Sequence, residues 1–335
     1  DGTTETLTDD QFSIVNGGET VTFSGLSKSS GAAVVNVTLK KLGTTSKTKD
    51  FVRSQTLEVT RTLRVNTINS GLTTTSNYGM RVEDEEISLN VPDVVNIVAI
   101  YESKDANTPV LDKLTFVSGL ALNTNSIIGE KIIGKDSRAI GQIVSRTANT
   151  VDFVYLNGNQ FTVGELINFE ESSIETILQG VTVGNFIDRT TNYTLDKGHK
   201  LQYCDYSKII RNANAGAPSK KLLIIFDQFQ SGISGDVFTV NSYTAERYAK
   251  DIPILAGQIP ASDIIDYRPR VKPFNLSDFG NSTNVSPFAF TSRSFETSNP
   301  FVITPNESSI MGFDYYVGRI DKVIIGQEEN VDVVE

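Results

Sequence analysis

The sequence has no tryptophan, and only one cysteine, one histidine and two methionines among its 335 residues. One cysteine cannot form an internal disulfide, and one cysteine with one histidine cannot build a Cys/His zinc site. No stretch approaches the ~18 consecutive apolar residues of a membrane-spanning helix. We therefore expect no disulfide scaffold, no metal, no cofactor and no membrane partner.

Basic residues are scarce as well. The chain has 30 Lys and Arg against 40 Asp and Glu, which gives a net charge of −10 and a pI of about 4.8. Nucleic-acid binding needs clustered Lys and Arg to neutralise phosphates, so nucleic acid is not an expected partner. The start at Asp1 shows no basic-then-apolar leader, so we expect no signal peptide and regard the chain as an excised fragment or a processed product.

Alternation of apolar and polar residues dominates the sequence, and Thr, Val, Ile, Tyr and Phe suit half-buried strands. Helix signals are confined to a short helix at 242–250, capped by Ser242, and a short turn at 203–210. We predict a mainly β fold of several small antiparallel β-sandwich or barrel modules with few short helices. The predicted strands are 33–39, 56–65, 94–101, 111–117, 140–145, 150–156, 222–229 and 317–325.

Three modules are predicted. They are an N-terminal β module at 1–82, a main β domain at 83–125 plus 186–335, and a small β-barrel inserted at 126–185. The inserted module repeats a short pattern, because Gly129-Glu130 is followed by Lys and Ile, and Gly164-Glu165 by Leu and Ile. Asn157-Gly158 predicts a hairpin turn, since both central residues of a type I′ turn need positive φ.

Candidate catalytic groups are few. Residues 129–136 match a phosphate-binding loop through its lysine, but Asp136 stands where Ser or Thr would bind magnesium, and a strand follows instead of a helix. His199 lies in a basic turn, and any His-dependent mechanism has to use it. Cys204 lies in an aromatic turn without a clear cationic cluster to activate it. A structural role explains each of these better, and we expect no enzymatic activity.

Two carboxylates, Asp263 and Asp266, resemble a glycosidase pair in spacing alone. On a strand, Asp266 would share a face with Arg268 and Arg270 and would more naturally pair with an arginine. Arg319 and Asp321 lie inside another apolar stretch, where charges are costly unless paired. We hypothesise that Asp266, Arg268, Arg319 and Asp321 form a structural ion-pair network that fixes strand register.

Residues 272–300 combine Pro, Asn, Ser and isolated aromatic residues without a clean period. Such a segment is either a long surface loop or one that becomes ordered against a neighbouring chain. We hypothesise an assembly contact there, while a simple tethering of the loop to its own domain explains the same pattern. The candidate contact residues are Phe274, Phe279, Phe288 and Phe290.

Five parts of the sequence carry a family likeness: residues 91–101, 193–206, 241–243 with 251–253, 262–271 and 315–322. Together they resemble large structural proteins of contractile-tailed phages, cyanophages especially, and the Gly-Glu-x-Ile unit resembles a module that recurs in such proteins. After the glycine of residues 193–206 these proteins usually have Gln-Arg, where this chain has His199 and Lys200. The resemblance covers about 85–335 and implies a virion structural role in a tail or baseplate, without catalytic residues.

The expected function is therefore protein–protein assembly within a phage tail or baseplate, made in the host cytoplasm and located in the virion. The expected partners are other virion proteins, with homo-oligomers possible. Two alternatives stay open: a receptor- or carbohydrate-binding module of a tail fibre, with a host receptor or glycan as partner, and a glycan-cleaving tail enzyme that would use Asp263. The absence of Trp lowers the case for a glycan groove.

Overall fold

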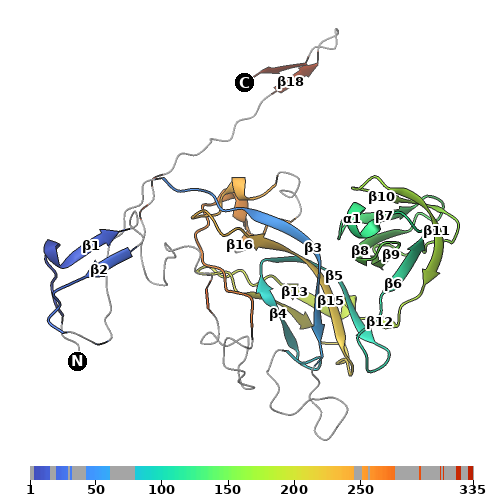
Figure 1. The fold of residues 1–335 in the computed structure, drawn as a ribbon, viewed down its shortest axis with the longest axis horizontal. Coiled ribbons are helices and arrows are strands. Elements are labelled where there is room, and N and C mark those ends of the chain that lie inside the picture. Colours follow the sequence, from blue (N-terminus) through green and yellow to red (C-terminus); the bar gives the residue numbers. More distant parts are fainter. Residues whose placement is uncertain are drawn as a thin grey trace, which may run out of the picture. The chain divides into compact units, whose positions relative to one another are not determined.

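A computed structural model describes residues 4–15, 20–28, 31, 43–60, 80–244, 251–255, 257–275, 294–295, 310, 312, 322–325 and 331–334. It divides into two compact units, residues 1–302 and 303–335. The described residues are mainly antiparallel β-structure, with α1 (Leu122–Asn125) as their α-helix (Figure 1). The predicted fold class is confirmed. Within the described residues, no helix is long and apolar enough to cross a membrane.

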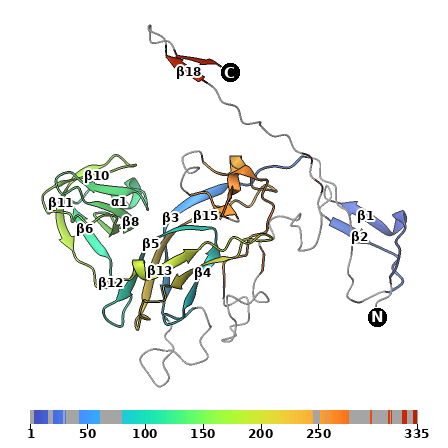
Figure 2. The same cartoon turned by 180° about the vertical axis from the view of Figure 1, so that it is seen from behind.

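The centre of the first unit is a β-sandwich. One sheet has the order β12-β5-β15-β3, and the other has the order β13-β14-β4. Figure 2 shows β3, β5 and β15 running side by side. The strands are β3 (Lys49–Val59), β4 (Glu86–Pro92), β5 (Val94–Ser103), β12 (Phe186–Asp188), β13 (Tyr193–Asp196), β14 (Tyr206–Arg211) and β15 (Leu222–Ser231).

Apolar side chains from both sheets form the core of the sandwich. Ile87 of β4, Ile100 of β5, Ile209 of β14 and Ile224 of β15 are all fully buried in one cluster. Alternation along each strand places such residues on the inner face, which is why period-2 patterning was informative. Strands predicted at 94–101 and 222–229 correspond to β5 and β15.

Residues 203–210, predicted as a turn, contain strand β14 instead. This prediction was wrong because β14 lies between β13 and β4 in its sheet, and pairing on both sides overrides the turn-like local sequence. Of the helix predicted at 242–250, Ser242 is the last residue of the 3₁₀ turn Val240–Ser242 and Tyr243 is extended, so the predicted helix start is wrong; 245–250 lie outside the described residues, as do 33–39.

Six strands close into a barrel with the order β10-β11-β6-β9-β8-β7. Its core is built around Phe116, Phe153 and Phe169, each at most 1% exposed. The strands are β6 (Asp112–Phe116), β7 (Lys131–Gly134), β8 (Ile140–Arg146), β9 (Thr150–Tyr155), β10 (Leu166–Phe169) and β11 (Glu175–Thr182).

Sheet membership crosses the module boundaries that the sequence predicted. β6 belongs to the barrel although it precedes residue 126, and β3 of the predicted 1–82 module pairs with β15 of the main sheet. The residues between β9 and β10 include Asn157-Gly158, but these two strands are not neighbours in the barrel. The predicted hairpin is therefore absent there: Asn157 instead accepts a hydrogen bond from the Ile140 N–H and donates one to the Arg138 carbonyl.

The barrel is internally duplicated. Strands β7 and β8 recur as β10 and β11 at a constant sequence offset, and both β8 and β11 carry a register shift at the equivalent place. The turn residues Arg138 and Ser173, also equivalent, share a positive φ of 59° and 56°. The Gly-Glu pattern seen in the sequence thus marks two halves related by approximate two-fold symmetry.

Each half of the barrel contains one buried glutamate that accepts hydrogen bonds from two turns. Glu130 accepts hydrogen bonds from the N–H of Ile127 (2.5 Å) and from the N–H and hydroxyl of Ser172 (2.9 and 3.0 Å). Glu165 repeats these contacts with Thr162 (2.6 Å) and Ser137 (both 2.9 Å). Each carboxylate therefore binds the turn of the other half of the barrel.

Short hairpins are found near both ends of the chain. β1 (Phe12–Val15) pairs with β2 (Thr20–Phe23) after the 3₁₀ turn Asp9–Gln11, and β18 (Lys322–Ile325) pairs with β19 (Val331–Val334). The remaining short elements are η3 (Thr190–Asn192), β16 (Ile254–Leu255), β17 (Ile259–Pro260) and η6 (Ala261–Asp263).

We predict that Glu130→Ala or Glu165→Ala lowers the free energy of unfolding of the barrel by about 2 kcal/mol or more, because each leaves several donors unpaired. Hydrogen exchange of strands β7 and β10 measures the loss. Lys131→Ala is the control, since its side chain is 52% exposed. Equal protection in all three variants would contradict the role of the glutamates.

Candidate functional site: a buried ionic cluster

Chemistry-bearing side chains of the described residues gather at one end of the sandwich, and we call this group the ionic cluster. Its members come from segments far apart in sequence: the start of β3, the β4–β5 connection, the β13–β14 loop and the stretch after η6. The ionic cluster consists of Lys49, Asp93, His199, Cys204, Asp266, Arg268 and Arg270.

Asp93 is at the centre. It has a positive φ of 59°, and its side chain is 1% exposed. Oδ1 lies 3.3 Å from Nζ of Lys49 and 3.1 Å from Nε2 of His199, while Oδ2 accepts a hydrogen bond from Nε of Arg270 at 3.1 Å. Burial alone would raise the pKa of Asp93, but the positive charges of Lys49 and Arg270 outweigh it and hold that pKa well below its ordinary value.

Asp266 is the second buried carboxylate. Arg268 binds it through Nε at 2.9 Å and Nη2 at 3.0 Å, and Nη2 of Arg270 binds it at 2.8 Å. Burial would raise the pKa of Asp266, but the two guanidinium groups, Arg270 first, lower it below the ordinary range. Arg270 thus joins both carboxylates, and its guanidinium lies 4.1 Å from the ring centre of Phe238.

Local backbone geometry presents His199 and Cys204 to the cluster. Gly198 has a φ of +75°, and a Cβ there would lie 2.5 Å from the carbonyl oxygen of Asp205. Only glycine fits this turn without strain. Short bridges then pair His199 with Cys204, and Cys204 with Arg270.

A metal ion does not fit this cluster. The ligand atoms of Asp93, His199 and Cys204 lie within 4.8 Å of one another. However, Lys49 and Arg270 already bind the two oxygens of Asp93, so a divalent cation would meet two fixed positive charges. Burial also raises the pKa of the Cys204 thiol to about 12, which opposes the thiolate that binds metals.

A nucleophilic triad does not fit either. The Nε2 atom of His199 faces both the Cys204 sulfur, at 3.9 Å, and Asp93, at 3.1 Å. A relay needs the base and the orienting carboxylate on opposite ring nitrogens, whereas here Nδ1 faces Arg268 at 3.2 Å. Burial also lowers the pKa of His199 despite Asp93, so the neutral imidazole is favoured.

The structure describes only some of the site residues that the sequence predicted. The Asp266–Arg268 pair of the hypothesised network is present, whereas Arg319 and Asp321 lie outside the described residues. Asp263 is exposed and accepts a hydrogen bond from the Ser262 hydroxyl, while Asp266 is buried, so their environments differ.

Sequence patterns did not find Lys49 or Asp93 as members of the cluster. The available signals were that Asp93 interrupts an apolar stretch, and so needs a buried partner, and that Arg270 shares a strand face with Asp266. Of the proposed contact residues, Phe274 is half-buried and packs edge-on against Tyr206 at 6.4 Å. The other three, Phe279, Phe288 and Phe290, lie outside the described residues.

The candidate phosphate-binding loop at 129–136 has a different outcome. Its residues 131–134 form strand β7.

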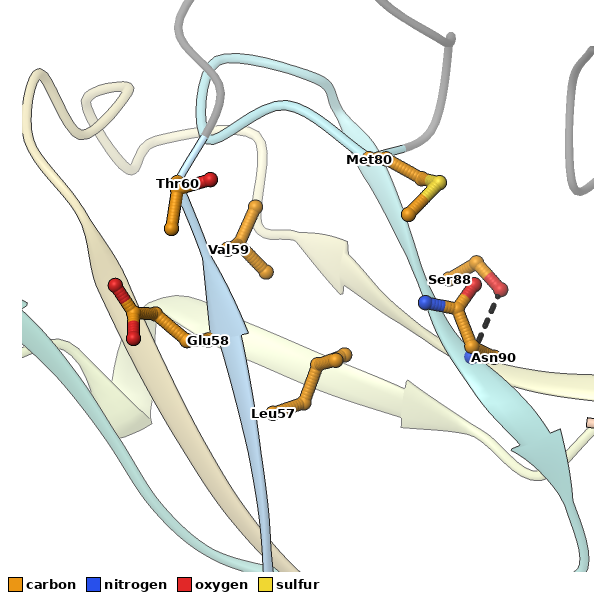
Figure 3. A pocket seen from close by; sticks show the side chains of 7 residues that line it. All are labelled: Leu57, Glu58, Val59, Thr60, Met80, Ser88 and Asn90. Carbon is orange, nitrogen blue, oxygen red and sulfur yellow. Dashed lines mark hydrogen bonds between the residues drawn. The ribbon is translucent and has the colours of Figure 1, made fainter. Parts of the chain in front are cut away.

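A small cavity of about 50 Å³ lies between β3 and β4, the edge strands of the two sheets (Figure 3). Its lining includes Val59 and Met80, together with Asn90, whose Oδ1 is buried without a hydrogen-bond partner. This volume suits a few water molecules, which would also satisfy that oxygen.

No family model, curated protein or solved structure matches the chain.

We predict that Arg270→Met lowers the free energy of unfolding by about 3–5 kcal/mol, because it leaves two buried carboxylates under-paired. Urea unfolding of the purified chain measures it. Lys221→Met is the matched control: its pair with Glu58 is about one third exposed and should contribute less than ~1 kcal/mol. Similar losses in both variants would reject the importance of burial.

Asp266 makes the free energy of unfolding depend on pH in the acidic range. Its native pKa lies below the value of ~3.9 expected in the unfolded chain, so its contribution is present above ~3.9 and lost as the pH falls toward the native pKa. We therefore expect stability to decrease between about pH 5 and about pH 3, and to decrease less steeply in Asp266→Asn. Urea midpoints at each pH test this, and parallel pH profiles would refute it.

Proposed function

We propose that this chain is a structural component of a phage tail or baseplate that acts through protein–protein assembly. The observation that carries the proposal is the convergence of three stretches that resemble phage structural proteins, 91–101, 193–206 and 262–271. They supply Asp93, then His199 and Cys204, and then Asp266, Arg268 and Arg270 to the ionic cluster.

The contacts within the ionic cluster favour a structural role. The charged groups of the cluster bind one another, and both carboxylates are at most 1% exposed. A substrate would have to displace these partners to reach them. The stretches that carry the resemblance thus supply residues that hold the sandwich together, and this supports the proposal of a structural role.

An assembly surface is available on the N-terminal hairpin. Register pairs Phe12 with Phe23 and Ile14 with Val21, so one face of the hairpin is entirely apolar. Ile14 is 61% and Phe12 37% exposed. A two-stranded hairpin is marginally stable alone and gains stability when such a face packs against another protein surface. Other virion proteins or a second copy of the chain would supply that surface.

The virion location is tested directly. We expect peptides of the chain in gradient-purified particles of the virus that encodes it, and labelling by a specific antibody on the tail in electron micrographs. Recovery of the chain from infected cells but not from particles would overturn the proposal.

The hairpin face is tested by substitution. We predict that Phe12→Ser with Ile14→Ser abolishes incorporation into particles, because the partner loses its apolar contact, while the melting temperature stays the same. Ser13→Ala, on the opposite face of β1, is the matched control and should incorporate normally. Normal incorporation of the double variant would remove the hairpin from the assembly surface.

A further inference from the structure

One contact in the ionic cluster places a buried amine directly beside a buried carboxylate. Nζ of Lys49 lies 3.3 Å from Oδ1 of Asp93, and the two side chains are 0% and 1% exposed. We propose that Lys49 and Asp93 condense to an intramolecular isopeptide bond once the chain has folded. The proposal concerns a covalent modification of this chain and does not depend on its assignment to a virion.

The surroundings of Lys49 exclude water and hold the amine in place. Its Nζ lies 4.9 Å from the ring centres of both Phe238 and Tyr243, and 5.6 Å from that of Phe229. Burial lowers the pKa of Lys49, although the charge of Asp93 partly opposes this, so the neutral nucleophilic amine becomes more accessible. Holding both groups in one dry pocket makes the reaction effectively unimolecular.

The acceptor carboxylate is bound on both oxygens by groups suited to the reaction. Arg270 Nε donates to Oδ2 at 3.1 Å, where negative charge develops when Nζ attacks Cγ. Nε2 of His199 lies 3.1 Å from Oδ1 and is placed to transfer protons to the departing oxygen. Cys204 Sγ also lies 3.6 Å from this oxygen.

The step balances without any co-reactant. The bond between Nζ of Lys49 and Cγ of Asp93 forms, and the bond between Cγ and Oδ1 breaks. Two of the three ammonium protons leave with Oδ1 as water, and the third remains on the amide nitrogen. A buried ammonium and carboxylate thus become a neutral amide, which removes the desolvation cost of keeping both ions in the interior. Oδ2 remains as a carbonyl oxygen for Arg270 to bind.

Such a bond would join the first residue of β3 to the β4–β5 connection. It would close a covalent loop across the sandwich between positions 44 residues apart. A cross-link of this kind resists mechanical and thermal opening in the same way as a disulfide and needs no oxidising compartment.

Intact-mass spectrometry of the purified, denatured full chain tests the proposal. We expect a mass lower than the sequence mass by one water molecule, and a tryptic product that joins the peptides of Lys49 and Asp93. Lys49→Arg should show its full sequence mass. Lys47→Arg, which changes another buried lysine, should still lose one water.

The full sequence mass in the wild-type chain would overturn the proposal and leave the pair ionic. A lost water that maps to a single linear peptide, such as a cyclised aspartate, would overturn it as well. Both measurements are made on the wild-type chain, so they do not depend on the folding of any variant.

Discussion

The ion pairs of Asp93 with Lys49 and Arg270 set the main constraint on this structure. Burying one of these charges alone would be prohibitive, so each segment that carries one has to meet the others. Lys49 and Arg270 are 44 and 177 residues away from Asp93 in sequence. The same contacts bring the β13–β14 loop and the stretch after η6 to the end of the sandwich, where few regular strand pairs are present. Side-chain electrostatics thus adds to the isolated backbone bridges that link these segments.

The barrel also contains buried polar groups that need partners, and these are backbone N–H donors. Its turns leave N–H groups that no strand can satisfy, and Glu130 and Glu165 accept them at equivalent positions of the two halves. Closure removes free sheet edges, so the barrel has little tendency to pair with other strands. The sandwich and the N-terminal hairpin do present edges and exposed apolar residues. This difference agrees with the proposed assembly role, in which residues outside the barrel contact partners.

The proposed structural role would explain these features together. Buried ions contribute less net stability than apolar residues of the same volume, but they penalise misaligned packing because an unpaired charge is so costly. A protein that has to present fixed surfaces to neighbours benefits from such a penalty. Three features would fix the relative positions of segments of the chain without any substrate. They are the ionic cluster, the paired glutamates Glu130 and Glu165, and the proposed isopeptide bond.

Local patterning by itself determined much of the strand content. Alternating β-branched and apolar residues predicted β5, β8, β9 and β15, because side chains of a strand alternate between a buried and an exposed face. The recurrence of Gly-Glu also indicated a repeated unit, which the barrel displays as two equivalent halves. Only tertiary structure decided the rest. Residues 203–210 became strand β14 through pairing on both sides, and β6 joined the barrel from outside the predicted module. Lys49, Asp93 and Arg270 carry no local signal of their meeting, because charge pairing depends on distance in space, which the order of residues along a chain does not specify.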